Sequence, residues 1–125
     1  MANPNIVNVT TIYGNTSTTS LSTTSATSVA SNAASSGKVY KINSIVVANT
    51  NGTAAANITI NVYSAAALGG TAYPIASTIS VPANATLIVT DKTTTFYLLE
   101  NQSIGATAGT ANYLTVTASW EEINS

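Results

Sequence analysis

Apolar and polar side chains alternate one by one along several stretches of this chain. In Ile58–Tyr63 the residues Ile58, Ile60 and Val62 alternate with polar ones, and successive side chains of a strand point to opposite faces. Asn112–Glu121 repeats the pattern. Strict alternation is typical of β-strands that bury one face. No stretch shows the spacing of an amphipathic helix, so the sequence predicts an all-β fold.

Short β-rich segments separated by turn-forming residues continue along most of the chain. Asn51-Gly52, Gly69-Gly70 and Pro82-Ala-Asn84 are such separators, because Gly and Asn tolerate positive φ and Pro presets φ for a turn. The expected strands are Ile6–Tyr13, Thr18–Ser25, Tyr40–Asn49, Ile58–Tyr63, Tyr73–Val81, Thr86–Thr90, Thr95–Glu100, Ile104–Ala108 and Asn112–Glu121.

Strands and turns at this spacing predict an antiparallel two-sheet β-sandwich, jelly-roll-like, with about eight strands. An immunoglobulin-like sandwich is the alternative, but its Cys–Trp–Cys pattern is missing from a chain without cysteine. A helical turn is expected at most once, at Ala65–Leu68.

One domain is expected for 125 residues. Within it, Thr16–Ser36 is rich in Ser and Thr, and Leu21 and Val29 are its only large apolar residues. This segment is either a flexible arm or a polar pair of strands on an outer sheet. We therefore expect residues 1–37 to form an N-terminal strand and a polar segment, an assembly arm in one interpretation, and residues 38–125 to form the sandwich core.

The side chains that perform most enzyme chemistry are rare in this sequence. Charged residues make up 6% of the chain, against about 25% in an ordinary domain. The absence of His and Cys removes the imidazole base, the thiolate nucleophile and the usual zinc ligands. The four carboxylates show no pairing on one face; they are Asp91, Glu100, Glu121 and Glu122. We expect no enzyme, no catalytic residue, no cofactor and no metal site.

The surface is expected to act by docking onto other proteins. A formal net charge of −1 predicts neither nucleic acid nor an anionic membrane as a partner. An edge strand can add to a partner's sheet, and aromatic residues on a polar strand face favour external contacts. The expected interaction residues are Ile6, Val7, Val9, Ile12 and Tyr13 of the N-terminal segment, with Tyr63 and Tyr113. No secretory signal is expected at the N-terminus.

Five segments carry a resemblance to a known class of proteins: Lys38–Asn49, Asn57–Tyr63, Ile79–Asn84, Tyr97–Ile104 and Leu114–Ile123. They follow the order strand, Pro-Ala turn, strand, Leu-Glu-x-x-x-Ile, and a closing strand that ends in acidic residues and Ile. In this pattern the chain resembles small virion proteins of tailed phages, especially phages of marine cyanobacteria. Residues 1–37 have no counterpart in the resemblance.

The resemblance implies a β-sandwich or jelly-roll subunit of a phage particle, made in the host cytoplasm and located in the virion. The expected function is that of a capsid decoration or cement protein that binds and stabilises the assembled shell. Its expected partners are copies of itself, as a homotrimer, and the major capsid protein or another virion protein. Two alternatives remain: a tail, neck or fibre component, and a carbohydrate-binding module for host attachment.

Overall fold

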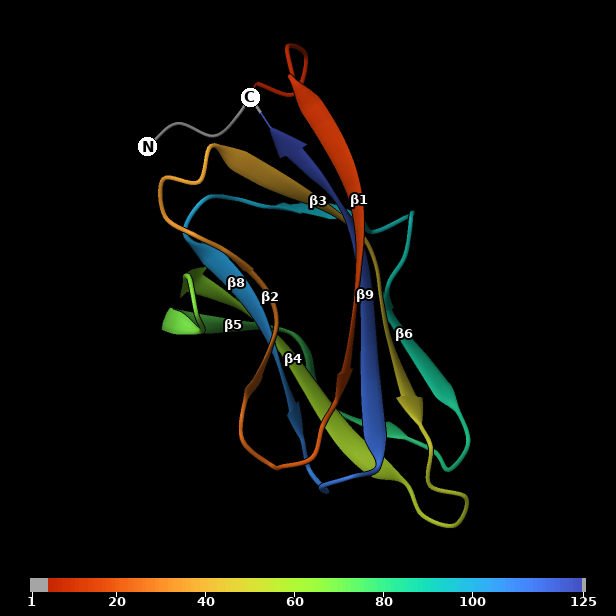
Figure 1. Ribbon diagram of the computed structural model, residues 1–125. Coiled ribbons are helices and arrows are strands. Elements are labelled where there is room, and N and C mark those ends of the chain that lie inside the picture. Colours follow the sequence, from red (N-terminus) through yellow and green to blue (C-terminus); the bar gives the residue numbers. More distant parts are fainter. Residues whose placement is uncertain (1–4, 125) are drawn as a thin grey trace.

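The computed structural model describes residues 5–124, in which nine strands form two antiparallel sheets and no helix is present (Figure 1). The all-β sandwich expected from the alternating pattern is confirmed. The strands are β1 (Thr11–Ser20), β2 (Thr27–Asn32), β3 (Lys38–Asn49), β4 (Ala56–Ala65), β5 (Gly69–Val81), β6 (Thr86–Thr90), β7 (Phe96–Leu98), β8 (Gln102–Ala108) and β9 (Leu114–Asn124).

The strand order is that of a jelly roll. One sheet has the order β1-β9-β3-β6, with β7 also paired to β3, and the other has the order β2-β8-β4-β5. The first strand thus pairs with the last, the second with the last but one, and so on inward, as in a long hairpin folded over into two layers. Both β6 and β7 pair with β3, so they are two halves of one strand position that the turn at residues 91–95 divides.

The core lies between the two sheets and is built from the inward faces of the alternating strands. Ile58 and Ile60 of β4 are fully buried, as are Val116 and Ala118 of β9. Leu21, which follows β1, is also fully buried, although it lies in the Ser- and Thr-rich segment. Residues 11–32 therefore contribute strands to both sheets and a side chain to the core.

The N-terminal strand begins later than the sequence pattern predicts. Expected at Ile6, it starts at Thr11, because the side chain of Asn5 accepts the Val7 N–H (2.9 Å) and the Asn5 carbonyl accepts the Asn8 N–H (3.1 Å). These two bonds form a local turn that competes with an extended strand.

The next expected strand, Thr18–Ser25, is correct only for Thr18–Ser20, which belong to β1, and wrong beyond Ser20. The chain leaves the first sheet after Ser20, where the fully buried Leu21 bonds to Leu114 (2.9 Å) and Asn112 (2.9 Å) through its backbone. It then enters the second sheet as β2, a strand that the apolar pattern did not reveal because it reads Thr-Ser-Val-Ala-Ser-Asn.

The connection between β4 and β5 is a tight turn and not the single helical turn that was expected. Ala67 and Leu68 have positive φ values of 56° and 60°, and the Gly69 N–H bonds to the Ala66 carbonyl (3.1 Å). Two consecutive left-handed residues define a type I′ turn, the geometry that suits the twist of a β-hairpin. Hairpin closure thus overrides the helical preference of alanine.

Candidate interaction surface

The four sheet edges differ in how well they are protected against pairing with another strand. β5 carries Pro74 and three register shifts against β4, β2 has a register shift against β8, and β6 is five residues long with a shift against β3. Bulges, prolines and short length are the usual protections of an exposed edge. β1 has none of them: ten consecutive residues pair with β9 in one unbroken register, without proline or charge.

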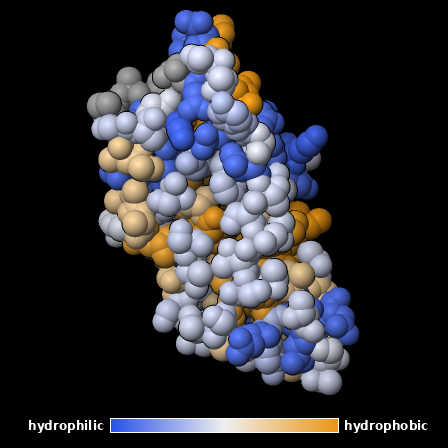
Figure 2. Space-filling view, in the orientation of Figure 1, coloured by the Kyte–Doolittle hydropathy of each residue, from blue (hydrophilic) through white to orange (hydrophobic). Residues whose placement is uncertain are grey.

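Ser and Thr make up most of β1. In Figure 2, drawn in the view of Figure 1, a pale band of intermediate hydropathy follows the course of β1, and orange atoms border its upper end. The edge therefore offers backbone groups and small hydroxyl side chains rather than charges. This surface suits contacts made by shape and hydrogen bonds, which salt screens little.

The expected N-terminal interaction residues gather at the start of β1. Ile12 and Tyr13 are 53% and 56% exposed, Ile6 is about half exposed, and Val7 is almost fully exposed at 92%. Val9 is half-buried. Ile12 and Tyr13 point to opposite faces of β1, because successive side chains of a strand do so. Exposed apolar side chains are typical of interaction sites, and the binding role of these residues stays a prediction.

The two tyrosines expected on polar strand faces are not free surface residues. Tyr63 is only 9% exposed, because its ring lies on the outer face of its sheet beside Leu68 and over Gly105, whose missing side chain leaves room for it. Tyr113 is half-buried, packs against the core, and accepts the Thr50 N–H at its carbonyl (2.8 Å). The Tyr63 side chain therefore presents little surface to a partner, and the external contact expected for Tyr63 and Tyr113 stays a prediction.

A second group of exposed apolar residues lies on the opposite rim and was not predicted. Its members are Tyr73, Ile75 and Ile79 of β5, Ile88 of β6 and Tyr97 of β7. In an unbroken strand the first three would share a face with the buried Val81, but the buried residues of β5 are Ala76 and Val81. The register shifts of β5 change which side chains face inward, since each extra residue reverses the alternation.

The charged residues concentrate on one pair of strands. Of the three basic and four acidic residues, two of each lie on β3 and β9, where Lys41 is opposite Glu121. Nζ of Lys38 is 3.4 Å from Oε2 of Glu122. A partly exposed pair of this kind stabilises a fold by about 0–1 kcal/mol. These charges therefore add a small contribution to the pairing of β3 with β9.

An aromatic pair lies beside these charges. The rings of Tyr40 and Trp120 stack with centroids 5.6 Å apart and planes 19° from parallel. Burial raises the pKa of Tyr40, the nearby Glu122 carboxylate raises it further, and Lys38 lowers it. Tyr40 therefore stays protonated at neutral pH and acts here as a packing residue.

A hydrogen-bonded turn holds Asp91, which is followed in the chain by Lys92. The Asp91 carboxylate accepts the Thr93 hydroxyl (2.6 Å) and the Thr93 N–H (2.9 Å). The side-chain bond is the main reason why the pKa of Asp91 lies below its ordinary value of 3.8. The folded turn thus favours the ionised acid, so this contribution is present above the ordinary pKa and is lost as the pH falls through the lowered one.

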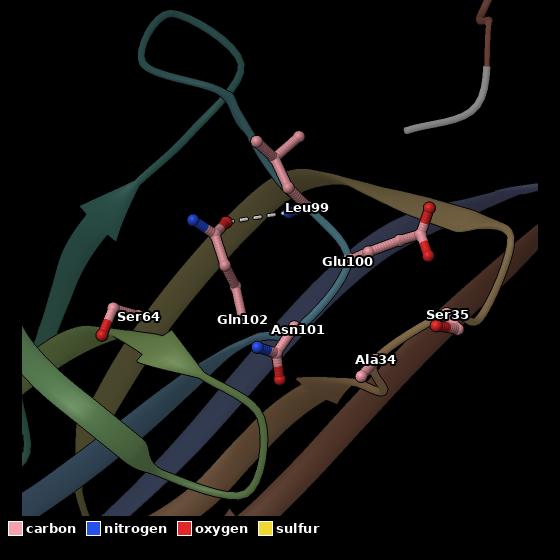
Figure 3. Close-up of a pocket in the computed structure, with 7 residues that line it drawn as sticks. All are labelled: Ala34, Ser35, Ser64, Leu99, Glu100, Asn101 and Gln102. Atoms are coloured by element: carbon pink, nitrogen blue, oxygen red, sulfur yellow. Dashed lines mark hydrogen bonds between the residues drawn. The ribbon is translucent and has the colours of Figure 1, made fainter. Parts of the chain in front are cut away.

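A shallow hollow of about 320 Å³ lies between the end of β4 and the two loops that follow β2 and β7 (Figure 3). It is lined by Ala34, Ser35, Ser64, Leu99, Glu100, Asn101 and Gln102. The side-chain oxygen of Gln102 accepts the Leu99 N–H (2.9 Å), and that of Asn101 accepts the Ala66 N–H (3.1 Å). Both side chains therefore stabilise the backbone around the hollow. Figure 3 shows Glu100 directed away from Gln102. With one titratable side chain, the hollow lacks the paired carboxylates of glycoside hydrolysis.

Within residues 5–124, no group of three or more His, Cys, Asp or Glu side chains is placed to hold a metal ion. The same residues include no helix long and apolar enough to cross a membrane.

Comparison with known proteins gives a fold and no family. The chain matches no protein-family model and no curated protein. Among solved structures, it is similar to a protein of Bacillus endospore appendages, described as a novel family of disulfide-linked pili, with a TM-score of 0.51 and 18% identity over 92% of this chain and 90% of that one. At this identity the similarity shows the fold alone. These 125 residues contain no cysteine with which to form such disulfides.

Proposed function

We propose that this chain is a non-enzymatic structural protein of a phage virion, a decoration protein that binds the assembled shell and stabilises it. The observation that carries the proposal is the exposure of Ile6 and Val7, two apolar residues that precede β1. Exposed apolar side chains of this kind favour docking onto a groove of another protein. The resemblance of residues 38–123 to small virion proteins is the reason for placing this docking on a phage particle.

The chemistry of the surface supports a role in a particle with many copies. Contacts between Ser, Thr and Asn side chains are individually weak, but many copies on one shell multiply them through avidity. One Met and no Cys leave few side chains that oxidation can damage outside a cell. The proposed partners are further copies of this chain, as a homotrimer, and the major capsid protein or another virion protein.

Binding to purified empty shells tests the docking role. The variant Val7→Asp places a charge on the most exposed apolar residue of the N-terminal group, and Ile88→Asp makes the same change at an exposed site on the opposite rim. We expect Val7→Asp to reduce the protein that co-sediments with shells by about tenfold, since a charge must be desolvated on docking, while Ile88→Asp binds normally. Equal binding of Val7→Asp and the unchanged protein would contradict the N-terminal docking site.

A fibre or appendage component of the virion is the second candidate, because the structural neighbour belongs to an appendage. The number of copies per purified particle separates the two candidates. A decoration protein is present in hundreds of copies, as the symmetry of a shell requires, whereas a neck or tail component is present in few. Absence of the chain from purified particles would exclude both.

A further inference from the structure

The hydrogen bonds at the two ends of β1 show which of its backbone groups face the open side. Leu21 donates its N–H to the Leu114 carbonyl (2.9 Å), and the Asn124 carbonyl accepts the Thr10 N–H (2.8 Å). On the other side of β9, the Tyr113 carbonyl accepts the Thr50 N–H (2.8 Å). The even-numbered residues of β9 therefore face β1, and in the unbroken register they pair with odd-numbered residues.

The even-numbered residues of β1 consequently direct their N–H and C=O groups to the open edge, because bonded and open positions alternate in an antiparallel strand. These residues are Ile12, Gly14, Thr16, Thr18 and Ser20. They form a set centred on Thr16. β1 contains no proline, which would remove a backbone hydrogen-bond donor, and no bulge, which would bend the edge away from a partner strand.

We infer that β1 is a self-association strand: a second copy of this chain adds its own β1 antiparallel to the first, about a two-fold axis at Thr16. In this register Thr16 lies opposite Thr16 of the second copy, Gly14 opposite Thr18, and Ile12 opposite Ser20. Each such pair exchanges two backbone hydrogen bonds. In this register even-numbered residues lie opposite even-numbered ones, so their side chains point to the same face. The outer faces of the two sheets therefore form one continuous surface, and the sheet continues from one copy into the next.

The side chains of β1 suit a second copy better than a partner of different chemistry. β1 has no charged residue, so a two-fold axis brings no like charges together, and cross-strand Thr–Thr pairs are favourable. The exposed Ile12 and Tyr13 lie on the same strand and gain cover next to Ser20 and Thr19 of the second copy. The other edges carry bulges or proline that oppose the same contact.

This contact does not depend on the proposed virion role. A two-fold contact joins pairs of protomers, so in a shell of homotrimers it would link one trimer to the next. Loss of shell binding would leave the β1 contact untouched, and a monomeric protein would leave the shell proposal untouched. The two proposals therefore fail separately.

Sedimentation velocity on the full chain, from micromolar to millimolar concentration, tests the inference. We expect a dimer for the unchanged protein and for Ser80→Lys, which adds the same charge at an exposed site on the bulged edge β5. Thr16→Lys should raise the dimer dissociation constant by about tenfold or more, because two like charges would lie directly opposite each other. Thr16→Glu should do the same, and an equimolar mixture of Thr16→Lys and Thr16→Glu should restore the dimer.

Amide hydrogen exchange gives a second measurement that is specific for the register. In the dimer, the amides of Gly14, Thr16 and Thr18 should be protected, and in Thr16→Lys they should exchange quickly while those of Asn15 and Ser17 remain protected by β9. A protein that is monomeric at millimolar concentration, a Thr16→Lys dimer as tight as the unchanged one, or open-ended assemblies in place of dimers would each overturn the inference.

Discussion

Two buried asparagines show how single side chains hold the ends of strands in this fold. Asn49, 2% exposed at the end of β3, donates its amide to the carbonyls of Val81 (2.9 Å) and Ala54 (3.0 Å) and accepts the Asn51 N–H (2.9 Å). Asn32 plays the same part at the end of β2, with bonds to Lys38, Leu98 and Ser36. A buried amide is stable in such a place because every polar group has a partner.

Replacing Asn49 with alanine should lower the free energy of unfolding by about 3 kcal/mol, because two carbonyls and one N–H lose their partner inside the protein. Asn57→Ala is the matched control, since Asn57 is exposed on β4, and it should change stability by about 0.5 kcal/mol or less. Urea unfolding followed by circular dichroism measures both. Similar midpoints for the two variants would show that the Asn49 bonds contribute little.

At the scale of elements, the β4–β5 turn folds back and covers part of the outer face of its sheet. A Cβ atom built on Gly105 of β8 would lie 2.8 Å from Cδ2 of Leu68 and 2.9 Å from Cε1 of Tyr63. The Leu68 N–H also bonds to the hydroxyl of Ser103 (2.9 Å). The absence of a side chain at position 105 is thus what lets the turn and the Tyr63 ring close over β8.

Gly105→Ala should destabilise the protein by about 1–3 kcal/mol, the usual cost of adding a methyl group to a packed site. Gly14→Ala on β1 is the control, because nothing lies within 4 Å of a Cβ there; its effect should be neutral or slightly stabilising. Thermal unfolding of the two variants decides the matter. If Gly105→Ala has the same melting temperature as the unchanged protein, the turn can move away without loss of stability and does not contribute to the fold.

Strands with many apolar residues were predicted well, and strands made mostly of Ser and Thr were predicted poorly. Thr86–Thr90 was predicted with the bounds of β6, and the predicted cores of β3 and β4 lie within the observed strands. β2 was expected only in the alternative of a polar pair of strands within Thr16–Ser36, and β1 was placed too early, because their Ser and Thr residues carry no pattern of hydropathy. The open edge of β1, which depends on pairing with β9, could not be seen without its neighbour.

At the scale of the whole molecule, the polar N-terminal segment completes both sheets. β1 forms the edge beside β9, β2 forms the edge beside β8, and the Leu21 and Val29 side chains enter the core between them. A boundary after residue 37 would therefore remove one strand from each layer. The segment belongs to the sandwich, while the residues before Thr11 lie outside both sheets in the described part of the chain.

A protein that lacks residues 1–37 should fail to unfold cooperatively, because the inward faces of β8 and β9 would lose the cover of Leu21 and Val29. A protein that lacks residues 2–10 should keep the cooperative transition, since both sheets retain all their strands. Calorimetry and the dispersion of amide NMR signals report the result. If residues 38–125 alone melt like the full chain, the N-terminal segment is an arm and not part of the folding unit.

The sequence by itself determined the class of fold, because alternation and turn chemistry act over a few neighbouring residues. The small number of charged and titratable residues is also visible in the sequence, and it restricts the chemistry available to the chain. The tertiary structure alone decided which face of Tyr63 is covered, which strands are edges and which edge is left unprotected. These properties arise where residues far apart in the chain meet, and a strand of Ser and Thr becomes an edge or a centre according to its neighbours and not its own side chains.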